Sequence, residues 1–256
     1  MSIHLGGVTY RVGAPLLAGL DEDPAVRLTR DTPAQLIGSL RTGELHAGLL
    51  SSIEAFRHSG YRVLRGLGIA SRGSVRSVRA FRRPGKPVRT VGLDSGSTTA
   101  VALLKILLHH VLGETDCTFE SITPTRTPDT LDHDLVLLIG DCGLEADPGT
   151  RQSLDLGKLW HDWTGLPFVY ALWLLSPGAD AELISEKLHQ AREAGRGVDD
   201  GTGGAVYYDL DDQDMQGLHR FHQEALLLGL AEPGINPAYV GVSAPRDLDT
   251  TMDEGN

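Results

Sequence analysis

Short apolar runs alternate with segments of helical period along most of the chain, and this alternation restricts the fold more than any other feature. Residues 26–29 predict a strand. Thr32 as an N-cap, Pro33 as the first helical residue and Gly43 after the last turn then delimit a short helix. Residues 47–50 predict the next strand. Strands that alternate with helices build βαβ units around a largely parallel sheet, so we predict an α/β fold.

A second cycle of strand, turn and helix follows further along the chain. Residues 88–93 predict a strand, residues 94–97 a turn, and residues 98–112 a strongly apolar helix that ends at Gly113. Residues 135–139 predict a third buried strand. Two such cycles fit two lobes within a chain of 256 residues.

Two further strand-like runs predict how the chain passes between the lobes. We expect residues 77–82 to lead out of the first lobe and residues 168–175 to return to it. The second lobe then comprises residues 86–170. The first lobe is discontinuous and comprises residues 1–85 and 171–256.

The composition excludes several classes of partner. The formal net charge is -11, so the chain repels phosphate backbones and anionic lipids, and we expect neither nucleic acid nor a membrane surface as a partner. Residues 1–20 show no secretion signal, so we expect a cytoplasmic protein. Cys117 and Cys142 lack a paired metal or redox spacing and predict two buried thiols. The sequence leaves the oligomeric state open.

Serine and threonine residues gather where predicted strands end and helices begin. They are Ser51, Ser52, Ser97, Thr98 and Thr99. Helix N-termini expose unpaired N–H groups and a partial positive charge, so hydroxyls at such places form a cup for a small anion. In an open α/β sheet, ligands also settle at the carboxyl ends of strands. The alternative is simple helix capping. The pattern favours a small-molecule carboxylate in a cleft between the lobes.

Three other stretches are candidate parts of the cleft. Residues 72–78 alternate Ser and Arg with apolar residues at a predicted crossover, although a half-exposed strand with solvated arginines fits equally. Residues 160–168 are rich in aromatic side chains, which wall a cleft or fill a core. Asp141 follows a buried strand and is the best single acid, with turn capping as its alternative.

The familiar catalytic motifs are absent from the sequence. It has no Gly-x-Ser-x-Gly elbow, no Gly-x-x-x-x-Gly-Lys phosphate loop, no Gly-x-Gly-x-x-Gly after the first strand and no His-Glu-x-x-His zinc pair. His109 and His110 lie inside an apolar helical pattern and predict structural roles. We therefore expect no metal site.

Several runs resemble the chorismate dehydratase family of menaquinone biosynthesis by the futalosine pathway. They are GELHAGLLSSIE (43–54), IASRGSVRSV (69–78), DSGSTT (94–99), LLIGD (137–141), DLG (155–157) and WTGLPFVYALW (163–173). The resemblance implies a two-lobed fold like that of type II periplasmic solute-binding proteins. It also implies loss of water from chorismate to give 3-[(1-carboxyvinyl)oxy]benzoate, without a redox cofactor or metal.

One position departs from the family pattern. The first strand of the family is followed by Leu-Asn-x-x-Pro-Leu, whose Asn faces the substrate, and residues 11–16 of this chain match that run with Val12 in place of the Asn. Asn236 and Asn256 are the only asparagines, so no shift of register supplies one. The matching serine is retained as Ser77. Valine cannot donate a hydrogen bond, and losing one transition-state donor costs on the order of 100-fold in rate.

The resemblance implies a role for each candidate residue. Ser77 is nearest the chemistry; Ser51, Ser52, Ser97, Thr98 and Thr99 hold carboxylates; Asp141, Thr164 and Gly165 line the cleft.

Three alternatives stay open. Val12 favours a divergent, non-catalytic relative that binds an aromatic or enolpyruvyl carboxylate. The sister enzyme that makes dihydroxynaphthoate lacks support because its Ser-Pro-Cys-Pro-Asn-Asp motif is absent, and a transport protein lacks support because no signal peptide is seen.

Overall fold

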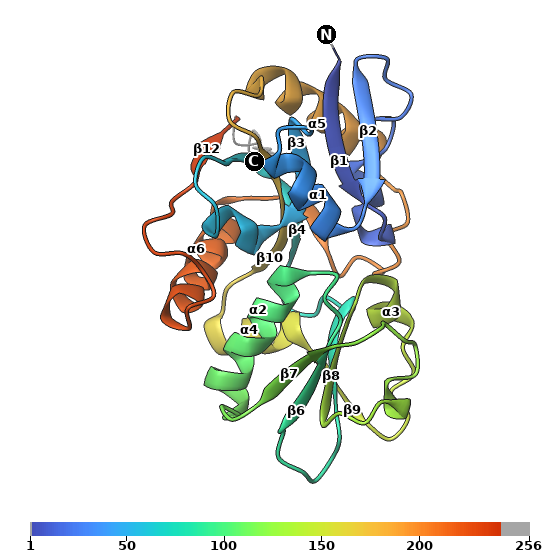
Figure 1. The fold of residues 1–256 in the computed structure, drawn as a ribbon. Helices are drawn as coiled ribbons and strands as arrows, with labels where there is room; N and C mark the ends of the chain where they lie inside the picture. The colour runs from blue at the N-terminus through green and yellow to red at the C-terminus, as the bar shows by residue number, and fades with distance from the viewer. Residues whose placement is uncertain (1, 242–256) are drawn as a thin grey trace, which may run out of the picture.

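The structure is a computed structural model that describes residues 2–241, and these residues form two α/β lobes, one above the other in Figure 1. Each lobe is built around its own sheet, with seven strands in one and five in the other within that range. The predicted two-lobed α/β fold is confirmed. Residues 242–256, which the sequence assigns to the first lobe, lie outside the described range.

The first lobe contains the seven-stranded sheet, ordered β11-β4-β10-β3-β1-β2 with β12 paired to β4. Its strands are β1 (Ile3–Val8), β2 (Val26–Asp31), β3 (Ala47–Ser51), β4 (Arg62–Ser71), β10 (Phe168–Leu175), β11 (Tyr207–Asp209) and β12 (Ala238–Val240). β1 is parallel to β2 and β3, whereas β10 is antiparallel to β3 and β4. The sheet is therefore mixed rather than largely parallel, because β10 enters it from the second lobe.

The second lobe contains the five-stranded sheet, ordered β7-β6-β8-β5-β9. Its strands are β5 (Val78–Arg82), β6 (Thr90–Leu93), β7 (Thr118–Ser121), β8 (Leu135–Ile139) and β9 (Gln152–Asp155). β6 is parallel to β7 and β8, whereas β5 is antiparallel to β8 and β9. β5 arrives from the first lobe, so it runs against its neighbours as β10 does in the other sheet.

The helices begin and end close to the predicted signals. They are α1 (Pro33–Arg41), α2 (Thr98–Leu107), α3 (Gly140–Glu145), α4 (Leu156–Thr164), α5 (Ala181–Ala194) and α6 (Asp212–Leu227), with the shorter turns η1 (Arg11–Leu16), η2 (Ser52–Phe56), η3 (Leu108–Leu112) and η4 (Pro128–Thr130). Thr32 caps α1, as predicted, because its Oγ1 accepts from Gln35 N at 3.4 Å. α2 continues through the π-helical turn η3 to Gly113, which has a φ of 67°. Glycine adopts this left-handed conformation without steric cost, so the helix ends there.

The chain passes between the lobes at residues 72–77 and again at residues 165–167. The two runs predicted as crossovers are the strands that follow these passages, β5 in the second sheet and β10 in the first. β5 lies inside the range 1–85 that the sequence assigns to the first lobe, yet it pairs with β8 and β9. The limits of the lobes themselves stay a prediction.

β8 is buried and lies in the middle of its sheet. All five of its residues are buried. A strand that is apolar on both faces must be covered on both. Pairing with β6 and β5 also leaves neither edge of β8 open. Its last residue, Ile139, consequently reaches the boundary with the first lobe.

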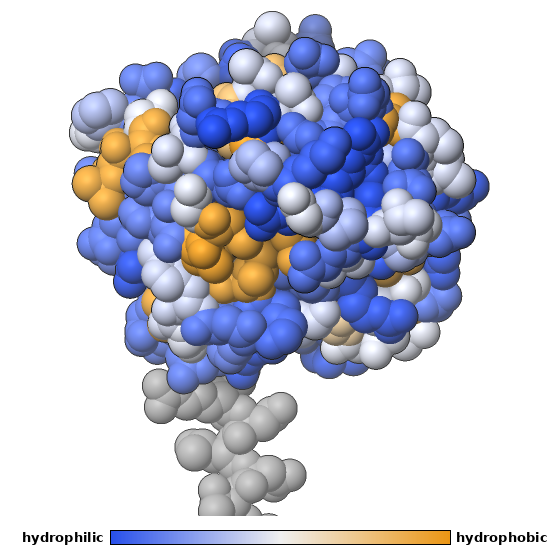
Figure 2. All heavy atoms as spheres, turned by 90° about the horizontal axis from the view of Figure 1, so that it is seen from below, coloured by the Kyte–Doolittle hydropathy of each residue, from blue (hydrophilic) through white to orange (hydrophobic). Residues whose placement is uncertain are grey.

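Exposed apolar area is limited on the face drawn in Figure 2. That face is largely hydrophilic, with one hydrophobic area near its middle and another at its left edge. The large hydrophobic side chains exposed on the described residues lie on separate elements: Val111, Phe119, Val198, Leu227 and Tyr239. Across residues 2–241, no helix combines the length and the apolar character needed to span a bilayer.

Candidate functional site

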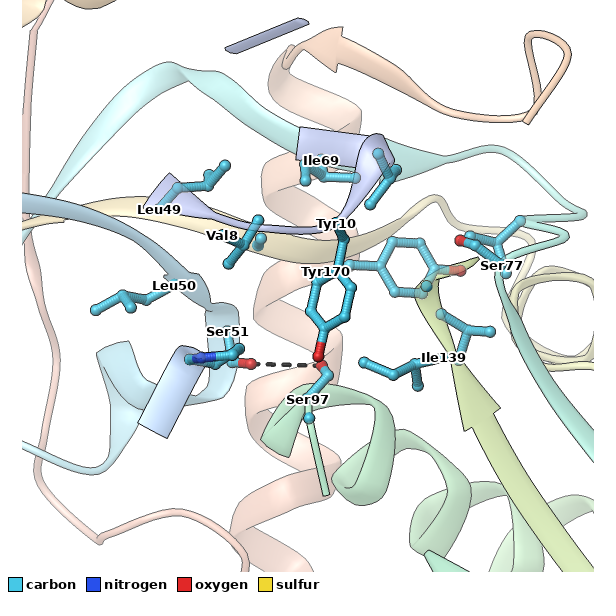
Figure 3. Close-up of a pocket in the computed structure, with 17 residues that line it drawn as sticks. Val8, Tyr10, Leu49, Leu50, Ser51, Ile69, Ser77, Ser97, Ile139 and Tyr170 are labelled. Carbon is cyan, nitrogen blue, oxygen red and sulfur yellow. Dashed lines mark hydrogen bonds between the residues drawn. The ribbon is translucent and has the colours of Figure 1, made fainter. Parts of the chain in front are cut away.

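A pocket lies between the two lobes, and both sheets contribute to its lining (Figure 3). The empty space at the pocket is about 570 Å³, which includes solvent at its open mouth. Val8 and Ser51 come from the first lobe, and Ile139 comes from the second. These are the last residues of β1, β3 and β8, so carboxyl ends of strands from both sheets meet at the pocket. This is where α/β sheets bind ligands.

Two serine hydroxyls, one from each lobe, meet in the pocket. Ser51 Oγ lies 3.4 Å from Ser97 Oγ, the contact drawn as a dashed line in Figure 3. Ser97 is also the N-cap of α2, because its Oγ accepts a hydrogen bond from Ala100 N at 3.2 Å. Capping and pocket lining thus coincide at Ser97. The positive end of the α2 dipole beside these hydroxyls favours an anion.

The other three hydroxyls predicted to hold a carboxylate have partners within the protein and do not line the pocket. Ser52 Oγ donates to a carbonyl of β10 at 2.7 Å, and Thr99 Oγ1 accepts from Ile53 N at 3.1 Å. Thr98 Oγ1 donates to Glu54 Oε1 at 3.0 Å. Ser52 Oγ also lies 3.3 Å from Thr99 Oγ1, so contacts of all three residues tie the start of α2 to the first lobe. The structure therefore gives Ser52, Thr98 and Thr99 an interlobe role, and their contact with a ligand stays a prediction.

Ser77 and Val12 both line the pocket: Val12 lies in η1 of the first lobe, and Ser77 lies at the end of the first passage between the lobes. Ser77 is 3% exposed, and its hydroxyl has no hydrogen-bond partner within residues 2–241. Val12 lies in η1, half-buried, and presents an apolar wall. The pocket thus contains both the unpartnered hydroxyl of Ser77 and the position where the family pattern has an amide.

The backbone before Ser77 is held by the first turn of α4. Asp155 is the N-cap of α4, and its side chain accepts from Lys158 N at 3.0 Å. The same carboxylate accepts from Val75 N at 3.0 Å and from Arg76 N at 2.8 Å. Arg76 has a φ of 63°, a left-handed conformation that costs a non-glycine residue about 1 kcal/mol. These bonds compensate for the strain and fix where Ser77 points.

Asp141, Thr164 and Gly165 do not line the pocket. Asp141 lies in α3 with Oδ1 buried and unpaired within the described residues, one position after the lining residue Gly140. Thr164 Oγ1 donates to the Trp160 carbonyl at 2.8 Å, and Gly165 ends α4 with a φ of 70°. The last two residues are helix-terminating groups at the second passage between the lobes.

Tyr10 and Tyr170 line the pocket and were missed by the sequence analysis. Tyr10 lies directly before the matched run at residues 11–16, and its place at the end of β1 was the available signal. Tyr170 lies inside β10, where its hydroxyl is 3.1 Å from Ser71 Oγ. Burial raises the pKa of Tyr170, so it is a neutral group at physiological pH. An aromatic in a strand gives no sign in sequence of which face it takes.

The pocket is electrically neutral at its surface, because no Asp, Glu, Lys or Arg side chain lines it. Asp94 lies behind this surface, 3% exposed, and accepts from the lining residues Gly96, through its N–H at 3.0 Å, and Ile139, through its N–H at 3.3 Å. Burial raises the pKa of Asp94, and these two N–H groups act against that rise. Any anion in the pocket must therefore be held by hydroxyl and N–H groups rather than by a cation.

Two comparisons of the sequence with known proteins point to the same family. A family model described as menaquinone biosynthesis matches residues 3–200. The chain is 30% identical over 196 residues to the chorismate dehydratase of Thermus thermophilus, an alignment that covers 67% of this chain and 69% of that relative. The predicted family resemblance is confirmed.

Comparison with solved structures shows the fold. A protein of Archaeoglobus fulgidus matches with a TM-score of 0.67 and 17% identity, over 90% of this chain and 98% of that chain. The periplasmic aliphatic sulphonate binding protein of Escherichia coli matches with a TM-score of 0.60 and 12% identity, over 94% of each chain. The chain thus has the type II periplasmic-binding-protein fold.

Proposed function

This chain belongs to the menaquinone biosynthesis family, and we propose that it dehydrates chorismate to 3-[(1-carboxyvinyl)oxy]benzoate. One observation carries the proposal. Ser77 and Val12, the positions that match the serine and the asparagine of the family pattern, line the same pocket, Ser77 from the first passage between the lobes and Val12 from η1. The 30% identity to a chorismate dehydratase supports the choice of substrate.

This dehydration requires the enzyme to orient the substrate more than to supply a strong acid or base. One C–H bond and one C–O bond of the ring break, the electron pair of the C–H bond completes the aromatic ring, and hydroxide leaves. We infer that a carboxylate of the substrate takes the ring proton, which then joins the hydroxide as water. Holding the substrate in one reactive geometry is worth a large part of such a barrier, about 7 kcal/mol or more in well-oriented systems.

The residues of the pocket fit a reaction in which the protein orients the substrate and the substrate carboxylate removes the proton. Ser77 has a hydroxyl without a protein partner and would donate to the departing oxygen, where charge develops. Ser51 and Ser97 would hold a carboxylate beside the N-terminus of α2. Val8, Leu49 and Ile69 would cover the ring and exclude water. A dry, neutral pocket strengthens each hydrogen bond made inside it.

A second candidate is a non-catalytic member that binds a small aromatic or enolpyruvyl carboxylate. Val12 favours it, because the valine side chain keeps the shape of the wall but removes a donor. Binding would survive such a change, since the carboxylate contacts come from other loops. Turnover would not.

Turnover by purified protein separates these two functions. We expect chorismate to be consumed and the aromatic product to form, followed by chromatography and ultraviolet absorbance. Ser77→Ala should lower kcat by about 100-fold if the hydroxyl acts in the transition state. Ser121→Ala, on the exposed strand β7, is the matched control and should leave kcat unchanged.

The result that would overturn the dehydratase is absence of product with intact, folded protein. If that protein still binds the aromatic product, the non-catalytic binding function replaces the proposed dehydratase function. If it neither turns over chorismate nor binds the product, both functions are wrong.

A further inference from the structure

Tyr10 carries a hydroxyl in the pocket for which the fold itself provides no partner. Of the five hydroxyl side chains in the lining, Ser51 and Ser97 contact each other and Tyr170 contacts Ser71. Within residues 2–241, neither Tyr10 nor Ser77 has a side-chain hydrogen bond. In Figure 3 the Tyr10 hydroxyl points to the Ser51 and Ser97 pair, whereas Ser77 lies on the other side of the pocket.

The position of that hydroxyl is fixed by two glycines of the second lobe. A methyl group on Gly96 would overlap the Tyr10 hydroxyl oxygen. A methyl group on Gly140 would lie 2.7 Å from Cδ1 of the ring. Tyr10 belongs to the first lobe, so its ring crosses the boundary and fits against backbone that only glycine leaves open. The side chain has little freedom to turn away from the pocket.

The hydroxyl is also held in its protonated form. Burial raises the pKa of Tyr10 to about 12, and Asp94, Cys142 and Asp141 add to the rise because a phenolate there would be repelled. At neutral pH the group is a hydrogen-bond donor. The same negative surroundings oppose a bound anion, so the pocket can hold one only with donors aimed directly at it.

We propose that the Tyr10 hydroxyl, together with those of Ser51 and Ser97, holds one carboxylate of the substrate. Tyr10 directly precedes η1, Ser51 ends β3 and Ser97 caps α2, and each brings one O–H to the same corner of the pocket. This assignment rests on the proposed function for its substrate, but it requires only a carboxylate ligand. A hydrogen bond to a charged group is stronger than one to a neutral group, so this contact selects the ionised ligand.

Ligand variants and protein variants together test the assignment. The aromatic product carries two carboxylates, and its two monomethyl esters each lack one of them. Calorimetric titration of Tyr10→Phe should show about 10- to 100-fold weaker binding of the product, the size expected for one hydrogen bond to a charged group. For one of the two esters, the dissociation constants of wild type and Tyr10→Phe should agree within about 3-fold. That ester lacks the carboxylate which Tyr10 would contact, so loss of the hydroxyl changes little.

Tyr61→Phe is the matched control, since Tyr61 is 6% exposed and lies outside the pocket lining. It should bind the product as the wild type does. Unchanged binding of the product by Tyr10→Phe would overturn the proposal. So would equal weakening for the product and both esters, because the hydroxyl would then act on pocket shape and not on charge.

A second measurement uses the unmodified protein. Tyrosine labelled with carbon-13 at Cζ gives a signal that reports the hydroxyl, and the Tyr10 signal is identified by its absence in Tyr10→Phe. We expect it to shift when product is added and to stay in place with the insensitive ester; no shift with product would contradict the contact. Chorismate turnover, measured in parallel, tests the dehydratase separately. If wild-type protein does not turn over chorismate but the product and its esters bind as expected, the proposed dehydratase reaction is wrong and the carboxylate site stands.

Discussion

Asp155 Oδ2 accepts a hydrogen bond of 2.8 Å from the backbone N–H of Arg76, the residue directly before Ser77. The same carboxylate accepts from Ser74 Oγ at 2.5 Å and caps α4 through Lys158 N. One side chain in the second lobe therefore organises both the first passage between the lobes and the start of a helix. This links the position of Ser77 to the stability of α4.

Asp155→Ala should destabilise the protein more than loss of an ordinary cap. We expect the free energy of unfolding to fall by about 2–3 kcal/mol, because the cap and several hydrogen bonds to one charged group are lost together. Asp180→Ala is the matched control, since Asp180 caps α5 through the single bond to Leu183 N at 3.1 Å. That variant should cost about 1 kcal/mol. Equal losses in urea denaturation would show that the loop bonds add no stability.

The left-handed conformation of Arg76 gives a second prediction. Arg76→Ala and Arg76→Gly both remove the bond from Arg76 Nη1 to the Thr202 carbonyl, which is 2.7 Å long. Only glycine also relieves the cost of a φ of 63°. We expect the glycine variant to be more stable than the alanine variant by about 1 kcal/mol, measured by denaturant unfolding. An alanine variant as stable as the glycine variant would mean that the backbone relaxes.

The sequence predicts the elements of this fold better than it predicts their pairing. Thr32, Pro33 and Gly43 mark the limits of α1 because caps and helix breakers act locally. The direction of β10 is not local. It depends on the chain having left for the second lobe and returned, so an apolar run alone cannot distinguish a parallel strand from an antiparallel one.

The candidate site shows the same division between local and distant causes. Ser51, Ser97 and Ser77 could be identified because each is adjacent to a predicted element end or matches the family pattern. Ser52 and Thr99 are chemically equivalent to them, yet both are 0% exposed in contacts between the lobes. Which of two neighbouring hydroxyls faces a pocket depends on how the lobes pack. Tyr10 was missed for the same reason, since Gly96 and Gly140 approach it only in the folded chain.

His222 predicts a pH dependence of stability. Its ring stacks on Phe56 with centroids 4.0 Å apart, and burial lowers its pKa, with a smaller contribution from His219. A folded pKa below the unfolded value means that the unfolded chain binds more protons between the two pKa values. This contribution to stability is therefore complete above the ordinary pKa of histidine and decreases as the pH falls through that window.

His222→Phe should remove that contribution while keeping the stacked ring. We expect the unfolding free energy of the wild type to fall more than that of the variant between pH 7.5 and pH 5.5, both followed by urea denaturation. Any difference in packing between the two proteins is independent of pH. The comparison therefore uses the slope of unfolding free energy against pH for each protein, not the absolute free energies. Parallel slopes would contradict the assignment to His222.

Val12 gives the prediction that bears most directly on turnover. Its side chain lines the pocket from η1, and an amide at this position would supply a donor that valine lacks. If that donor acts mainly in the transition state, Val12→Asn should raise kcat for chorismate by roughly 10- to 1000-fold with little change in KM. Val12→Leu is the control for shape and should give no gain. Steady-state rates of the three proteins decide the matter: full wild-type activity without a gain from asparagine would show that the site works through a different set of contacts, without an amide at this position.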